Sequence, residues 1–160
     1  MITKTEILER IADDLPLRII SDGARPYLER HYIGTAFGWR FYLHRFVGPD
    51  PAGGLHDHPW RLAFSLRLAG RYFEETRYGM RTQRRLGILT GDTFHRVAVL
   101  STPTVWTLFG HSVGGEKPWG FLSFLKTGAG SFEPYTYQRE GNQAKWWTTA
   151  KSKKQMRAGQ

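Results

Sequence analysis

Cysteine is absent from the 160 residues of this sequence. The absence excludes disulfide bonds, thiolate zinc sites, iron–sulfur clusters and cysteine nucleophiles, so a metal ion could be held only by nitrogen or oxygen donors. Long hydrophobic runs are missing too, because no apolar segment approaches the roughly 18 residues of a membrane span. The first 16 residues carry four acidic side chains and lack the basic start of a secretory signal peptide. We therefore expect a cytoplasmic protein that does not contact membranes.

Hydrophobic residues make up 40% of the sequence and aromatic residues 14%, which is enough material for one core. The length predicts a single compact domain, which we place at residues 1–150. The net charge is +9, but residues 139–160 hold six cations against one anion. We expect residues 151–160 to form a flexible basic tail. The charge makes nucleic acid a possible partner, although no nucleic-acid-binding motif accompanies it.

Helical periodicity is confined to the start of the chain. Thr3 and Glu6 have the spacing of a capping box, and an apolar stripe ends at Pro16, which predicts a helix over residues 4–15. Short alternating segments follow, separated by Gly, Pro and Asp, at residues 39–46, 60–69, 72–78, 95–100, 104–109 and 120–125. This pattern predicts an all-β domain, an antiparallel sandwich or barrel over about residues 39–126.

Two histidines, His56 and His58, introduce one of these segments. Because strand side chains alternate between faces, both imidazoles share one side, and we expect that side to continue through the apolar even-numbered positions up to Leu68. Pro59 interrupts the strand ladder directly after them. Imidazoles two residues apart on an inward face can both reach one point inside a barrel, as adjacent metal ligands must.

A second segment adds a third histidine. Gly91 and Asp92 suit a tight turn that leads into a strand, on which His95, Val97 and Val99 share one face. His95 is therefore expected to point toward apolar surroundings as well. Two imidazoles from one strand and one from another strand are the donors of a facial metal site.

These residues resemble a known family. The pair His56 and His58, with Gly70 downstream, resembles the first cupin motif, and the run from Gly91 to His95 resembles the second. The resemblance covers most of the expected barrel and implies a double-stranded β-helix, or jelly roll, with a metal ion inside. The chain also resembles small cupin-domain proteins of bacterial and phage genomes, a likeness that supplies no activity. Cupins commonly pair through sheet edges, so the resemblance further implies a homodimer.

One ligand of the usual cupin site is missing. The first cupin motif has a glutamate after three or four further residues, where this sequence has Leu62 and Ala63. The resemblance thus implies a three-histidine site, similar in its ligands to cysteine dioxygenase and diketone-cleaving cupins. Three neutral ligands leave the ion its full charge and up to three open positions, which favours an anionic chelating substrate. We expect Fe(II), with Mn, Ni and Zn as alternatives.

Two further residues are catalytic candidates. Tyr72 and Glu74 keep the parity of the histidine strand if Gly70 adds no bulge, and either could then move a proton beside a bound substrate. Glu74 is also an alternative carboxylate ligand. The competing interpretation is that both are exposed strand residues.

Other polar and aromatic residues have plainer expected roles. We expect Asp57 to be a solvated turn carboxylate, with an acceptor for a ligand histidine as the alternative. His44 shares its parity with polar neighbours, so we expect it to face solvent. Trp60, Trp106 and Trp119 are expected in the core, the alternative being the wall of a pocket for a planar or sugar substrate.

The sequence thus favours a small metal-dependent cupin enzyme that acts on a small anionic substrate, an oxidoreductase of the dioxygenase type if the metal is iron. One alternative is a metal-free cupin isomerase or epimerase, with a histidine as base and Tyr72 as acid. Another is a non-catalytic module that binds a sugar, a nucleotide or nucleic acid. A carbonic-anhydrase-like zinc site also uses a His-x-His pair, but the chain is short for that fold.

Overall fold

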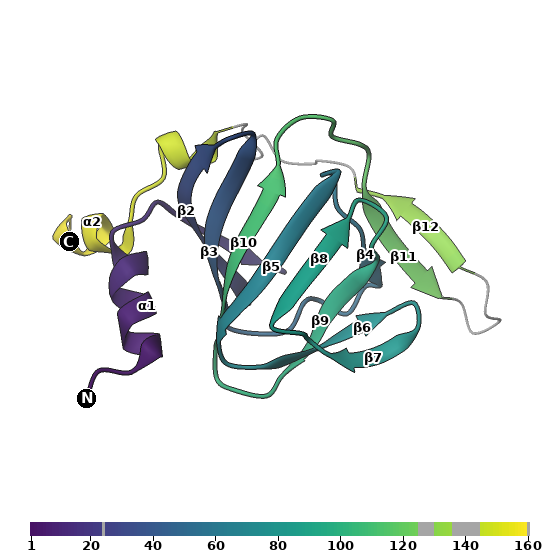
Figure 1. The fold of residues 1–160 in the computed structure, drawn as a ribbon, viewed down its shortest axis with the longest axis horizontal. Helices are drawn as coiled ribbons and strands as arrows, with labels where there is room; N and C mark the ends of the chain where they lie inside the picture. Colours follow the sequence, from purple (N-terminus) through teal and green to yellow (C-terminus); the bar gives the residue numbers. More distant parts are fainter. Residues whose placement is uncertain (24, 125–129, 136–144, 160) are drawn as a thin grey trace.

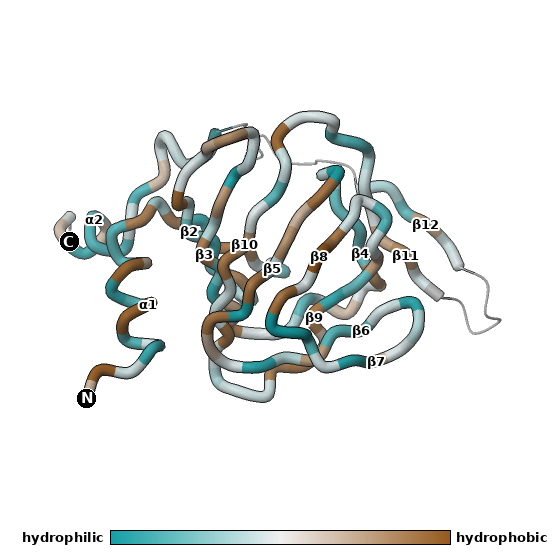
Figure 2. The backbone as a smooth tube through the Cα atoms, in the orientation of Figure 1, coloured by the Kyte–Doolittle hydropathy of each residue, from teal (hydrophilic) through white to brown (hydrophobic). Residues whose placement is uncertain are grey.

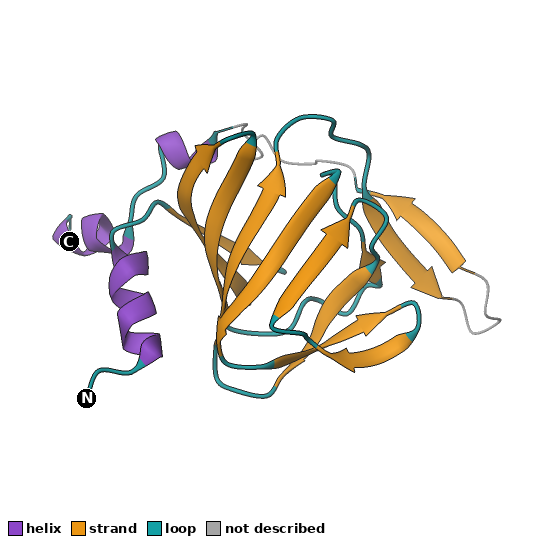
Figure 3. Ribbon diagram, in the orientation of Figure 1, coloured by secondary structure: helices purple, strands orange, loops and turns teal. Residues whose placement is uncertain are grey.

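The computed structural model describes residues 1–23, 25–124, 130–135 and 145–159. In that part of the chain two antiparallel six-stranded sheets face each other, and the helices lie at one side (Figures 1 and 3). The expected all-β architecture with a short N-terminal helix is confirmed. Among the described residues, no helix has the length and apolarity needed to cross a bilayer.

The first sheet has the strand order β1-β2-β3-β10-β5-β8. Its strands are β1 (Leu17–Ser21), β2 (Pro26–Ala36), β3 (Trp39–Phe46), β5 (Leu62–Ala69), β8 (Leu86–Thr90) and β10 (Val105–Ser112). The second sheet has the order β12-β11-β4-β9-β6-β7. Its strands are β4 (Leu55–His56), β6 (Tyr72–Thr76), β7 (Gly79–Thr82), β9 (His95–Leu100), β11 (Gly120–Phe124) and β12 (Gly130–Pro134). The chain therefore changes sheet repeatedly, as jelly-roll connections require.

An apolar cluster joins the inner faces of the two sheets. Leu28, Phe46 and Val105 come from the first sheet and are at most 8% exposed. Tyr72 and Val97 come from the second sheet and pack against them. Burying a side chain of this size contributes roughly 1.5 to 3 kcal/mol. The cluster therefore holds the sheets together beside the cavity described below.

The first sheet begins before residue 39, where the sequence pattern placed the start of the barrel. β1 and β2 form a hairpin that the sequence analysis missed. Phe37 and Gly38, with φ of 52° and 73°, form the two-residue turn into β3, and paired positive φ values suit such short hairpin loops. A register shift between Tyr32 and Gly34 breaks the alternation of β2. That bulge explains why no period of two was visible there.

Helix α1 (Lys4–Asp13) confirms the expected N-terminal helix and ends two residues early. The hydroxyl of Thr3 accepts from the N–H of Glu6 at 3.2 Å, and the Glu6 carboxylate accepts from the N–H of Thr3 at 2.7 Å. Ala12 packs against Leu43 and Trp106 on the outer face of the first sheet. The helix thus covers apolar side chains on the outer face of β3 and β10.

The expected flexible tail is a helix instead. Ser152 caps α2 (Lys153–Ala158) through a second capping box. Lys153 donates to the Glu29 carboxylate at 2.8 Å, and Arg157 donates to Asp13 at 2.6 Å. α2 lies beside α1 and is mostly hydrophilic (Figures 1 and 2). The prediction of a flexible segment is therefore wrong for residues 151–159, because carboxylates of the same chain pair with these cations. A 3₁₀ turn, η1 (Trp146–Thr148), precedes it.

The strand after the histidines has the opposite parity to the one expected. Ala63 and Ser65 face the interior at 2% and 8% exposure, whereas Leu62 is 38% exposed. The bend at residues 59–61 lies outside any strand and shifts the alternation by one residue. An extra residue at Leu68, opposite the step from Trp106 to Thr107, then shifts it back.

Gly70 completes this second shift. Its φ is +74°, and a Cβ there would stand 2.4 Å from the carbonyl oxygen of Thr104. Only glycine fits that position without displacing backbone. As a result Tyr72 and Glu74 point inward, at 3% and 5% exposure. The interpretation of both as exposed strand residues is excluded.

Candidate metal site and barrel cavity

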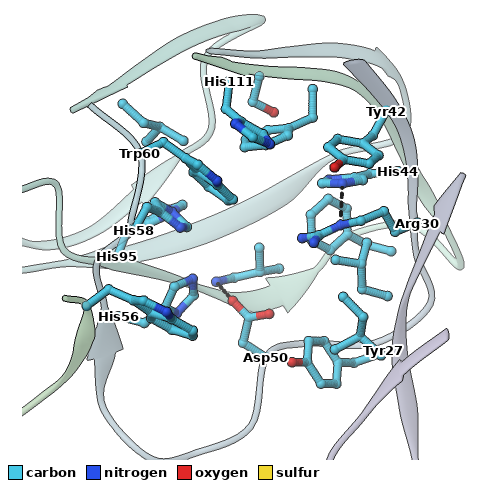
Figure 4. Close-up of a pocket in the computed structure, with 18 of the residues that line it drawn as sticks. Tyr27, Arg30, Tyr42, His44, Asp50, His56, His58, Trp60, His95 and His111 are labelled. Atoms are coloured by element: carbon cyan, nitrogen blue, oxygen red, sulfur yellow. Dashed lines mark hydrogen bonds between the residues drawn. The ribbon is translucent and has the colours of Figure 1, made fainter. Parts of the chain in front are cut away.

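The three histidines come together through one cross-strand pair and one short loop (Figure 4). β4 has two residues and lies between β11 and β9, where His56 is directly opposite His95. His58 follows two residues later, and its ring centroid lies 5.1 Å from that of each partner. The convergence expected from the sequence is therefore present.

The spacing of the ring nitrogens fits a metal ion. One nitrogen of each imidazole lies within 4.8 Å of the others, and Nε2 of His58 is 2.9 Å from Nε2 of His95. Two nitrogens that bind one ion at about 2.1 Å are roughly 3 to 3.5 Å apart. Burial, with a contribution from His95, lowers the pKa of His56 to about 3, and burial also holds the pKa of His58 well below its usual value. Both rings are therefore neutral at neutral pH, the form that binds metal.

Glu74 lies behind His95, on the side away from the other two histidines. Nδ1 of His95 is 3.3 Å from Oε1 of Glu74, and Arg81 contacts Oε2 at 3.0 Å. Burial alone raises the pKa of Glu74, but the hydrogen bond with His95 and the contacts with Arg81 outweigh it and lower that pKa. An ionised carboxylate on Nδ1 leaves Nε2 with its lone pair, an arrangement common around metal-binding histidines.

Tyr72 extends this chain of contacts. Its hydroxyl donates to Oε1 of Glu74 at 3.4 Å. Burial, followed by the charge of Glu74, raises the pKa of Tyr72 well above its usual value. The phenol therefore remains protonated at neutral pH, inside the cavity.

Comparisons with known proteins bear on the fold. No protein-family model and no curated protein matches the sequence. A cupin-2 domain from Rhodospirillum rubrum matches 71% of this chain and 78% of its own, with a TM-score of 0.55 and 12% identity. A cupin 2 conserved barrel domain protein from Rhodopseudomonas palustris matches 68% and 77%, with a TM-score of 0.52 and 9% identity. This protein has the cupin fold. A sugar phosphate isomerase of the cupin superfamily from Silicibacter pomeroyi also matches, over 76% and 89%, with a TM-score of 0.54 and 14% identity. At such identities the likeness shows the fold and leaves the activity open.

The place of the missing cupin glutamate is filled by packing. Ala63 faces the interior and belongs to an apolar cluster with Tyr42, Leu89 and Phe109. Glu74 does not replace the glutamate as a ligand, because its oxygens contact His95 Nδ1, Tyr72 and Arg81. The candidate metal ligands of this cupin-fold protein are therefore three histidines.

Asp57, between the two ligands of the loop, is not the solvated carboxylate that we expected. It is 2% exposed, and Oδ1 accepts from the N–H of Gly120 at 2.7 Å. Oδ2 accepts from Lys117. Asp57 thus fixes the histidine loop to β11. It accepts hydrogen bonds from Gly120 and Lys117 and not from a ligand histidine, which was the alternative role.

The opposite wall of the cavity is polar, which the sequence analysis missed. The cavity has a volume of about 1840 Å³ and lies between the sheets. His44, expected in solvent, is 4% exposed and faces this cavity (Figure 4). Arg30 donates from Nε to Nε2 of His44 at 3.1 Å. Burial, with Arg30 adding to it, holds the pKa of His44 well below its usual value. His44 is therefore a neutral acceptor that orients Arg30.

The tryptophans have three different positions. Trp60 lines the cavity between His58 and His111, with ring centroids 4.8 and 4.4 Å away and nearly parallel planes. Both faces of its ring are thus occupied. Trp106 is 1% exposed and lies on the outer face under α1. Trp119 lines the cavity and stacks on Tyr135 at 4.3 Å. The expectation of a core position holds for Trp106 alone.

Asp50 is a further cavity residue that sequence reasoning missed. Its Oδ2 accepts from the N–H of Val97 at 2.7 Å, and its own N–H donates to the Val97 carbonyl at 2.9 Å. Burial raises the pKa of Asp50 although the Val97 N–H opposes the shift. Figure 4 shows the carboxylate at the cavity wall near His56. Two flanking prolines mark this segment as a loop, so the sequence offered no alternation from which to predict its direction.

Proposed function

We propose that this cupin is a metal-dependent enzyme that acts on a small anionic substrate. The convergence of His56, His58 and His95 on one point of the cavity wall supports the proposal. Fe(II) is the proposed ion, with Mn, Ni and Zn as alternatives, because imidazole suits all of them. When bound, the ion supplies Lewis acidity or, if it is iron, chemistry with dioxygen.

The residues around the histidines have distinct proposed roles. Glu74 is a positioning residue, because it accepts from Nδ1 of His95 and keeps Nε2 directed at the shared point. Tyr72 holds a proton within hydrogen-bonding distance of Glu74, so it is the proposed donor to a bound substrate. Asp50, with its raised pKa, is a second group that can take up a proton at this wall.

The metal-free isomerase or epimerase is the second candidate. The observation that favours it is the Glu74–His95 contact, because a carboxylate behind an imidazole also orients a general base. Tyr72 would then be the acid. The two candidates differ in one measurable property, since chelator treatment abolishes turnover in the first and leaves it unchanged in the second.

Elemental analysis of protein purified without an affinity tag tests the main proposal. We expect about one transition-metal ion per chain in the wild type and less than a tenth of that in His58→Ala and in His95→Ala. His44→Ala is the matched control, because it removes an imidazole from the opposite wall of the same cavity. It should retain the metal. A metal-free wild type, or equal metal content in all four proteins, contradicts the proposal.

A further inference from the structure

The wall of the cavity opposite the histidines carries a positive charge without a counter-ion. Arg30 extends from β2 into the cavity, and its guanidinium carbon lies 5.3 Å over the ring of Tyr42 (Figure 4). Within the described part of the chain, no carboxylate comes within 4.0 Å of its nitrogens, whereas Arg45 and Arg81 each have such a partner. A guanidinium keeps its proton in proteins. Arg30 is half-buried and lines the cavity, so this charge is available to an anion that enters there.

The geometry prepares Arg30 to bind an oxyanion. Its Nε donates to His44, and among the described residues its two terminal nitrogens have no hydrogen-bond acceptor. The ring of His44 is itself fixed by stacking on Phe109, at 4.8 Å and 14°. The guanidinium is thus held in one orientation, with terminal donors free for the two oxygens of a carboxylate or phosphate.

The size and lining of the cavity point the same way. Its volume of about 1840 Å³ exceeds the roughly 300 to 1,000 Å³ of most ligand pockets. It therefore has room for a molecule that reaches both walls. Trp60 offers no open ring face for stacking, because His58 and His111 cover it. Trp60 therefore supplies no stacking surface to a ligand, whereas Arg30 supplies a charge at the far wall.

We propose that Arg30, oriented by His44, is an oxyanion-binding subsite, and that the substrate carries a second carboxylate or phosphate besides the group that meets the histidines. The statement that one group of the substrate meets the histidines rests on the proposed function. The subsite itself does not, since neither Arg30 nor His44 is a candidate metal ligand.

The first experiment uses metal-free protein and inorganic phosphate. Titration calorimetry should show saturable phosphate binding that weakens about tenfold or more in Arg30→Met, because a charge-assisted pair of hydrogen bonds is lost. Arg71→Met is the matched control, since it removes the same charge from an exposed turn, and it should bind like the wild type. Arg30→Lys should fall between, because a lysine binds as a point charge without the fork. Circular dichroism confirms that each variant is folded.

The second experiment uses metal-loaded protein and two ligands of equal carbon number, 2-oxopentanoate and 2-oxoglutarate. They share a metal-chelating end and differ only in the terminal carboxylate. The wild type should prefer 2-oxoglutarate about tenfold, and Arg30→Met should lose the preference while binding 2-oxopentanoate unchanged. Equal phosphate binding in Arg30→Met and wild type, or a preference that survives the substitution, overturns the subsite. Absent metal with Arg30-dependent phosphate binding overturns the proposed function and leaves the subsite standing.

Discussion

Two groups of polar side chains, each with one buried histidine, lie on the inner and the outer face of the barrel wall. The inner histidine cluster consists of His56, His58 and His95. The outer charge cluster lies under α1 and α2, on the outer face of the first sheet, and consists of Glu29, His31, Arg45 and Lys153. His31 is fully buried, whereas His95 is 7% exposed and His56 and His58 are half-buried. Burial alone therefore does not identify the candidate metal ligands.

The two clusters differ in the partners of their charged groups and ring nitrogens. In the outer charge cluster Glu29 contacts Lys153 at 2.8 Å and Arg45 at 3.3 Å, and His31 stacks beside Trp106. These cations all have partners, and the cluster attaches helices to the sheet. In the inner histidine cluster, lone pairs converge beside a large cavity. Convergence beside an open cavity, rather than burial, thus distinguishes the candidate metal ligands from the other histidines.

The largest expected effect is a loss of unfolding free energy at the outer face that leaves the inner histidine cluster unchanged. Trp106 is 1% exposed and packs between α1 and the sheet, so Trp106→Ala should lower the free energy of unfolding by about 4 kcal/mol. Urea denaturation measures this change. Metal content per folded chain should stay at the wild-type value, and a parallel loss of metal would show that the outer face also shapes the site.

Glu29→Gln should remove the charge balance of the outer cluster. Burial alone raises the pKa of Glu29, but His31, whose Nε2 lies 3.6 Å away, and the hydrogen bond from Lys153 lower it to about 2. The stabilisation by its carboxylate is complete above its ordinary pKa and is lost as the pH falls through about 2. After allowance for solvent screening we expect about 2 kcal/mol at pH 6. Urea unfolding at pH 6, 4.5 and 3 should show a flatter dependence in the variant, and identical slopes would contradict the assignment.

Glu74→Gln tests the inner histidine cluster through its metal affinity and not through the stability of the fold. An amide can still contact Nδ1 of His95 but no longer carries the charge that makes the imidazole a stronger ligand, so metal affinity should fall roughly 10- to 100-fold. Competition with a chromogenic chelator measures the affinity. Glu75→Gln is the control, because Glu75 is the next residue of the same strand and pairs with Arg96, away from His95 Nδ1. Equal affinities in the two variants would remove Glu74 from the site.

The smallest effect concerns the attachment of α2. Ser152 is 4% exposed and caps the helix that carries Lys153, so Ser152→Ala should cost about 1 kcal/mol of unfolding free energy. Ser152→Asp, which can also cap, should restore most of it. A loss in both variants would indicate that packing, rather than capping, holds the helix.

The sequence was sufficient for the fold class and for the histidine trio because each signal was local to one strand segment. His56 and His58 are two residues apart, and alternation holds over so short a distance. The sequence offered an inward position for Tyr72 and Glu74 only as one of two interpretations. They do point inward, but only because two parity shifts, at residues 59–61 and at Leu68, cancel. No pattern in a single sequence reveals such a cancellation.

The prediction that His44 faces solvent was wrong for a different physical reason. The rule that apolar strand faces point inward assumes a filled core and a solvated exterior. In β3 the interior is a polar cavity, whereas Leu43 on the outer face lies under α1. The polar face of β3 therefore points into the barrel and its apolar face points outward, the reverse of the usual pattern. The same inversion hid Arg30, and the pairing of α2 with acidic groups far away in the sequence hid the second helix.

The brevity of β4 has a consequence for folding. This strand is joined to β9 by the single pair of His56 with His95, so the second sheet is continuous only through two residues of chain. An ion held by the three histidines would cross-link these strands and favour the closed barrel by mass action. Amide hydrogen exchange in β4 and β9 should then slow when metal is added, because local opening becomes rarer. The ligand set would serve as a clasp for the sheet as well as a site for chemistry.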